Sequence, residues 1–140
     1  MSPAWGPAWR AALRYVALVF AAGFVLGTVR TLVLVPRLGE TAAVLLELPV
    51  MLTVSWAVCA RAVRREGVSP AHRVRLAMGS LALVLLLLAE VALGLTLFGR
   101  TGAEVLAGFG TVPGGIGLAG QVAFGLVPLL QGLRETGGSA

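Results

Sequence analysis

Charge is scarce in this sequence. Lysine and aspartate are absent, and charged residues make up 12% of the 140 residues. A soluble domain carries roughly 25% charged residues, so this chain has too few to cover a soluble surface. Its hydrophobic content of 58% indicates a membrane protein instead.

Cysteine and histidine are also rare, which excludes several kinds of site. Cys59 is the only cysteine, so an intrachain disulfide cannot form. His72 is the only histidine, so no histidine pair can bind haem or a metal. We expect no cofactor. Because aspartate is missing, no Ser–His–Asp arrangement exists, and we expect the protein not to be an enzyme.

Four apolar segments are each long enough to cross a bilayer, which takes about 20 residues. We expect Pro36 to end the first span, Thr111 to cap the fourth, a short interfacial helix over 103–109 and a disordered tail over 131–140. The sequence predicts one all-α membrane domain over 1–140, an up-down-up-down four-helix bundle with spans at about 14–35, 41–60, 76–98 and 112–130.

A signal peptide is the rival interpretation of the first span, because Arg10 and Arg14 precede an apolar core. The apolar stretch is longer than a signal core, and no small-residue cleavage site leads into a polar start. We therefore expect the segment to be retained as a span.

The arginines predict the orientation of the spans. One side of the membrane would hold eight of them: Arg10, Arg14, Arg61, Arg64, Arg65, Arg73, Arg75 and Arg134. The other side would hold only Arg37 and Arg100. This bias predicts that both termini are cytoplasmic. It also accounts for the basic composition without a nucleic-acid partner, and leaves the lipid bilayer as the expected environment.

Aromatic residues follow the same division. Trp5, Trp9, Tyr15 and Trp56 fall near the predicted cytoplasmic interface, where amphipathic rings prefer to lie. We expect them to act as membrane anchors.

Four polar residues lie inside the predicted spans: Arg30, Glu47, Glu90 and Gln121. A charge at the centre of a spanning helix costs roughly 2.5–3.5 kcal/mol, so these side chains should face inward and meet. Depth favours an Arg30–Glu47 pair across the first hairpin, with Glu90 as the second partner of Arg30. One arginine cannot neutralise two carboxylates, and we expect Glu90 to be the protonated one.

Glycines beside these residues suggest close helix contacts. We expect helix packing at Gly23, Gly27, Gly94, Gly117 and Gly125. Residues 115–120 also match G-x-G-x-x-G, but they lie inside a predicted span without the preceding strand that a dinucleotide site needs.

The block over residues 23–65 resembles a family of small uncharacterised bacterial inner-membrane proteins with four spans. The resemblance lies in Gly27-x-x-Arg30, Pro36-Arg37-Leu38-Gly39-Glu40 and Glu47-x-Pro49-x-Met51. It implies a location in the bacterial inner (plasma) membrane and brings no known activity.

Two functions remain open at this stage. The first is a non-catalytic membrane component, in which the polar cluster joins the helices and a homodimer or larger membrane complex forms. The second is a small proton- or cation-coupled transporter that acts as a homodimer, because intramembrane charges often serve transport.

Overall fold

The chain is helical throughout the range that the computed structural model describes, residues 5–138. The elements are α1 (Trp5–Val29), the π-helical turn η1 (Arg30–Leu34), α2 (Val35–Leu38), α3 (Glu40–Glu66), α4 (His72–Thr96), α5 (Gly102–Phe109) and α6 (Val112–Gly138). Within these residues there is no strand, so the expected all-α class is confirmed. Four helical segments are each long and apolar enough to cross a membrane: the continuous segment Trp5–Leu38, made of α1, η1 and α2, and the helices α3, α4 and α6.

Pro36 does not end the first helical segment, contrary to the prediction. The segment continues through α2 to Leu38 and ends at Gly39, whose φ of 85° favours glycine. The turn before the proline is π-helical, and its Val35 N–H donates to the Arg30 carbonyl. In a regular α-helix the proline ring would clash with the carbonyl four residues earlier, and the wider turn avoids this clash.

The loop between α3 and α4 is shorter than the sequence predicted, and the last helix is longer. α3 continues past residue 60 to Glu66, and α4 begins at His72, so only residues 67–71 form the loop. α6 likewise continues to Gly138, and the tail expected to be disordered is helical over 131–138. Residues 139–140 of that tail lie outside the described residues. Thr111 caps α6 as expected, since its hydroxyl accepts from the Gly114 N–H.

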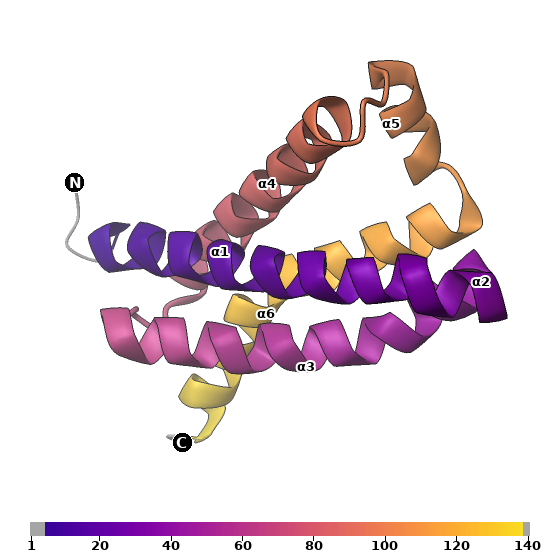
Figure 1. Ribbon diagram of the computed structural model, residues 1–140. Helices are drawn as coiled ribbons and strands as arrows, with labels where there is room; N and C mark the ends of the chain where they lie inside the picture. Colours follow the sequence, from indigo (N-terminus) through magenta and orange to yellow (C-terminus); the bar gives the residue numbers. More distant parts are fainter. Residues whose placement is uncertain (1–4, 139–140) are drawn as a thin grey trace.

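The long helices alternate in direction, and both ends of the described chain lie at one end of the bundle (Figure 1). Glu66 at the end of α3 binds Arg10 and Arg14 near the start of α1. Arg75 near the start of α4 binds Glu135 near the end of α6. We call this the closed end of the bundle. At the other end, the open end, α4 leans away from α1 and α3, and α5 bridges to α6 (Figure 1).

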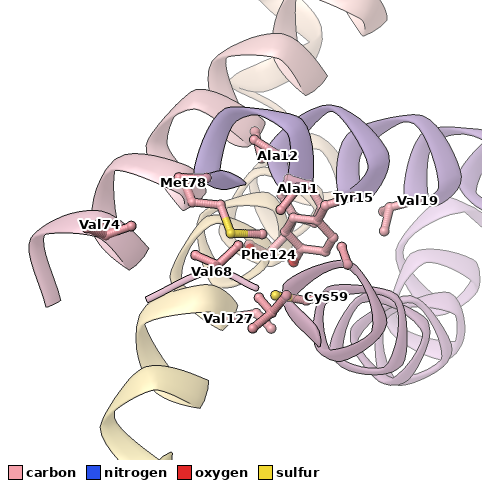
Figure 2. Packing of buried hydrophobic residues seen from close by; sticks show 14 of the residues in the cluster. Ala11, Ala12, Tyr15, Val19, Cys59, Val68, Val74, Met78, Phe124 and Val127 are labelled. Atoms are coloured by element: carbon pink, nitrogen blue, oxygen red, sulfur yellow. Dashed lines mark hydrogen bonds between the residues drawn. The ribbon is translucent and has the colours of Figure 1, made fainter. Parts of the chain in front are cut away.

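The buried core lies toward the closed end. Figure 2 shows Tyr15 of α1 and Met78 of α4 pointing toward Phe124 of α6, beside Cys59 of α3. The Tyr15 and Phe124 rings stack with centroids 4.2 Å apart. The Tyr15 hydroxyl donates to the Phe124 carbonyl at 2.6 Å, an acceptor that Pro128 leaves without its helical N–H donor. Tyr15 is therefore a core residue, and its predicted role as an interface anchor is wrong.

α4 and α6 make their closest approach at a pair of glycines in this core. A Cβ atom at Gly79 would lie 1.8 Å from the Gly125 carbonyl oxygen, which no side chain could tolerate. The two backbones therefore touch at this point, and α4 diverges from the bundle beyond it.

The five glycines predicted to serve helix packing differ in what faces them. Cβ atoms at Gly94 and Gly125 would each lie 3.2 Å from a neighbouring side chain, so both glycines allow close contacts. At Gly23 the nearest neighbour is a methionine of α3 at an ordinary 3.5 Å, and at Gly27 it is a side chain of the same segment. Gly117 has nothing within 4 Å, so it makes no close helix contact and the prediction is wrong there.

Arg75 is buried at the closed end, although the sequence suggested an exposed arginine in a basic loop. It is 1% exposed, and its guanidinium ties the 67–71 loop to α6. It donates to the carbonyls of Ser69 at 2.9 Å, Pro128 at 3.2 Å and Val68 at 3.4 Å, and to the Glu135 carboxylate at 2.5 Å. These contacts also explain why the end of α6 is ordered as a helix.

The outer surface of the bundle is strongly apolar. Leu32 is 71% exposed, and Val25 and Leu88 are each 61% exposed. Many further leucine, valine and phenylalanine side chains are exposed along the four long helices. A soluble monomer rarely shows so much continuous apolar surface, so this exterior suits contact with lipid.

Candidate functional site

The open end of the bundle has a partly open cavity of about 910 Å³ that all four long helices and α5 line. Val19, Ser55, Leu86 and Phe124, at the edge of the buried core, form its floor. Small-molecule sites typically occupy about 300–1,000 Å³, so this space is large enough for a ligand. The four polar residues predicted to meet, Arg30, Glu47, Glu90 and Gln121, all line it.

Arg30 and Glu47 form an ion pair across the first hairpin. The Arg30 Nη1 atom donates to the Glu47 Oε2 atom at 2.5 Å. The Arg30 side chain is 33% exposed and that of Glu47 is 12% exposed, so the pair lies in the cavity wall rather than in the sealed core. This is the contact that the sequence favoured first. Arg30 is also the first residue of the π-helical turn.

Glu90 and Gln121 form the second polar contact in the cavity. The Gln121 amide nitrogen donates to the Glu90 Oε2 atom, and this bond joins α4 to α6. Among the described residues, no arginine lies within ion-pair distance of Glu90, so it is not the second partner of Arg30 that the sequence suggested. The expected single cluster is therefore two separate pairs.

The two pairs nevertheless line the same cavity. Arg30 and Glu47 cancel each other's charge, so of the carboxyls of Glu47 and Glu90 only that of Glu90 lacks an ion-pair partner among the described residues. The Gln121 side-chain carbonyl oxygen is buried and has no hydrogen-bond partner in the part of the chain that the structure describes. A buried acceptor without a donor is costly, so this corner of the cavity suits a hydrogen-bond donor.

The cavity-facing side of α3 has a pattern that the sequence analysis did not use. Glu40, Val44, Glu47, Met51 and Ser55 all line the cavity and recur at spacings of three and four residues. That spacing places them on one face of a helix. Ser55 could have been found in this way, because it follows Glu47 by two turns.

Two charged residues lie near the open end of the cavity. Glu40 begins α3 and Arg100 precedes α5; both are exposed and both line the cavity. Gly117 on the α6 wall faces open space, so a side chain introduced there would project into the cavity without a clash.

The site offers little for metal binding. Among residues 5–138, no three His, Cys, Asp or Glu side chains come together in a way that could hold a metal ion. His72 lies at the closed end, at the start of α4, and does not line the cavity.

Comparisons of the chain with family models, with curated proteins and with solved structures give no match. The resemblance to small bacterial inner-membrane proteins therefore stays a prediction.

Proposed function

We propose that this chain is a non-catalytic, multi-pass protein of the bacterial inner membrane that binds a small polar or positively charged solute in its open-end cavity. The observation that carries the proposal is the position of the intramembrane polar groups. Polar residues that only join helices are expected to lie between closely packed helices. Here all four line a cavity large enough for a ligand.

The arginine distribution supports an orientation with both termini in the cytoplasm. Eight of the eleven arginines lie at the closed end, where both ends of the described chain are found. Short loops rich in arginine favour the cytoplasmic side. In this orientation the cavity lies in the outer half of the membrane.

The two polar pairs have different roles in this proposal. The Arg30–Glu47 pair is neutral overall and holds the first hairpin together. Glu90 is the group available to a solute, because its only side-chain hydrogen-bond partner among residues 5–138 is an uncharged amide. If Glu90 carries a proton in the empty protein, as the sequence analysis predicts, a cation could bind as that proton leaves.

A second function is a small proton- or cation-coupled transporter that acts as a homodimer. The same carboxyl favours it, since an unpaired acid in a membrane cavity can exchange a proton for a cation. Transport further requires access to the cavity from each side in turn. A second copy of the chain could complete such a path.

The first experiment tests whether water reaches the cavity. In a Cys59→Ala background, Gly117→Cys places a thiol in the cavity and Leu88→Cys places one on the exposed apolar surface. Thiol reagents act on the thiolate, which forms only where water is present. In proteoliposomes we expect a membrane-impermeant reagent to label Gly117→Cys and to spare Leu88→Cys. Equal protection of both thiols would overturn the proposal.

The second experiment separates binding from transport. Glu90→Gln, Arg30→Ala and the control Glu104→Gln, which changes an exposed acid outside the cavity lining, are compared for folded yield and for proton or cation flux. Transport predicts that Glu90→Gln folds normally and stops the flux, while the control retains it. A protonated Glu90 should also show a carboxylic C=O band in the infrared spectrum that disappears in Glu90→Gln.

A further inference from the structure

Positive charge gathers at the closed end of the bundle and is only partly neutralised there. This end holds eight arginines and two glutamates. Glu66 is shared by Arg10 and Arg14, and Glu135 binds the buried Arg75. Five exposed arginines at this end have no ion pair within the described residues: Arg61, Arg64 and Arg65 of α3, Arg73 of α4 and Arg134 of α6.

Three of these arginines form a stripe along the last turns of α3. Arg61, Arg64 and Arg65 are separated by three and four residues, so their side chains share one face of the helix. Like charges at this spacing destabilise an isolated helix. The acid nearest in sequence, Glu66, is turned toward α1 instead. The stripe therefore lacks a counter-charge among the residues that the structure describes.

A tryptophan lies on the same helix as the stripe, nearer to the middle of the membrane. Trp56 precedes Arg61 by five residues, or roughly 7–8 Å along the helix. The Arg134 guanidinium lies 5.5 Å from the centroid of the Trp56 ring. Tryptophan prefers the level of the lipid headgroups. Arg61, Arg64 and Arg65 then lie just outside the apolar layer, at the height of the lipid phosphates.

We propose that Arg61, Arg64 and Arg65 form a binding site for the phosphate of an anionic phospholipid headgroup. Guanidinium groups match phosphate geometry well. The apolar helix below the stripe places a lipid, rather than a nucleic acid, within its reach. This inference depends on the membrane embedding that the proposed function assumes, and not on the cavity or its ligand.

The test measures which lipid lies next to Trp56. In a Trp5→Phe, Trp9→Phe background, Trp56 is the only tryptophan, and phospholipids brominated close to the headgroup quench its fluorescence on contact. The protein is reconstituted in phosphatidylcholine bilayers containing a small fraction of brominated phosphatidylglycerol or brominated phosphatidylcholine. We expect phosphatidylglycerol to be preferred by at least about fivefold, the contribution of a single arginine at a membrane surface.

The variants decide whether the stripe causes this preference. Arg61→Gln, Arg64→Gln and Arg65→Gln together should reduce it to about twofold or less, and the three lysine substitutions should restore part of it. Arg37→Gln with Arg100→Gln, at the opposite end, should leave it unchanged. Raising the salt from about 0.05 to 0.5 M should weaken it, because salt screens surface charge.

Three outcomes would overturn the inference. These are equal quenching by the two lipids, a preference that survives the triple glutamine variant, and loss of the preference to a competing oligonucleotide, which would assign the stripe to nucleic acid. If neither brominated lipid quenches Trp56, the helix is not in the bilayer, and membrane embedding itself fails. The labelling of Gly117→Cys tests the cavity independently.

Discussion

The burial of Arg75 leads to a prediction that the sequence alone would not make. Arg73 and Arg75 are two residues apart in a basic stretch, and either could serve orientation. Arg73 is exposed, whereas Arg75 is 1% exposed and donates four hydrogen bonds. We expect Arg75→Met to destabilise the fold strongly, and Arg73→Met to change the free energy of unfolding by less than about 0.5 kcal/mol.

The magnitude follows from what Arg75→Met leaves behind. Breaking a buried ion pair typically costs about 3–5 kcal/mol, because one charge stays buried without a partner. Here the remaining partner, Glu135, has a side chain that is 48% exposed, so it can be hydrated again. We therefore expect the lower end, about 3 kcal/mol. Arg75→Lys keeps the charge but loses the planar fork, and should fall between the two methionine variants.

Unfolding of the detergent-solubilised protein by sodium dodecyl sulfate, followed by circular dichroism, measures these differences. Both methionine variants retain seven of the eight arginines at the closed end, so neither should invert in the membrane. Equal unfolding midpoints for Arg73→Met and Arg75→Met would refute the reasoning, since they would show that the contacts of Arg75 add nothing to stability.

Three further predictions use the same unfolding assay. Gly79→Ala should cost about 1–3 kcal/mol because its Cβ would overlap a backbone oxygen of α6, whereas Gly117→Ala, which faces open space, should be neutral or stabilising by up to about 1 kcal/mol. Tyr15→Phe should cost about 1 kcal/mol by leaving a buried carbonyl without its hydroxyl donor. Arg30→Gln, Glu47→Gln and the double variant should give a coupling energy of about 1–2 kcal/mol, since the two side chains are in direct contact.

Each of these predictions has a result that contradicts it. Equal costs for the two alanine variants would mean that α4 and α6 do not touch at Gly79. A Tyr15→Phe variant as stable as the parent would remove the hydroxyl from the core contacts. Additive effects of Arg30→Gln and Glu47→Gln would show that the two side chains do not interact in solution.

Much of the local structure could be predicted, because it depends on neighbouring residues. Apolar runs of sufficient length formed helices, and Thr111 capped α6 as its side chain and position suggested. The predictions failed where a change in helix geometry or a contact with another helix compensated for residues that usually end a helix. The first helical segment continues past Pro36 because the turn before it is π-helical. The polar tail is helical because Glu135 binds Arg75 and Gln131 binds the Trp56 carbonyl.

The arrangement of the polar residues in the site was also predicted only in part. That Arg30, Glu47, Glu90 and Gln121 would turn inward followed from the cost of placing polar groups in hydrocarbon. The depths of these residues favoured the Arg30–Glu47 pair first, but they also left Glu90 as a second partner of Arg30 and did not pair Glu90 with Gln121. In the structure Arg30 pairs with Glu47 and Glu90 pairs with Gln121, because the turn η1 that carries Arg30 packs against α3 and, among the described residues, does not contact α4.

The sequence by itself determined that this chain is helical, that four of its segments can span a membrane, and that its few internal polar groups cannot face lipid. These properties depend on composition and on spacing along one helix. Only the tertiary structure decided that Arg75 and Tyr15 are core residues, and that the polar pairs line a cavity instead of a sealed contact. These features depend on where α4 touches α6 and how far it then diverges, which are relations between residues remote in sequence.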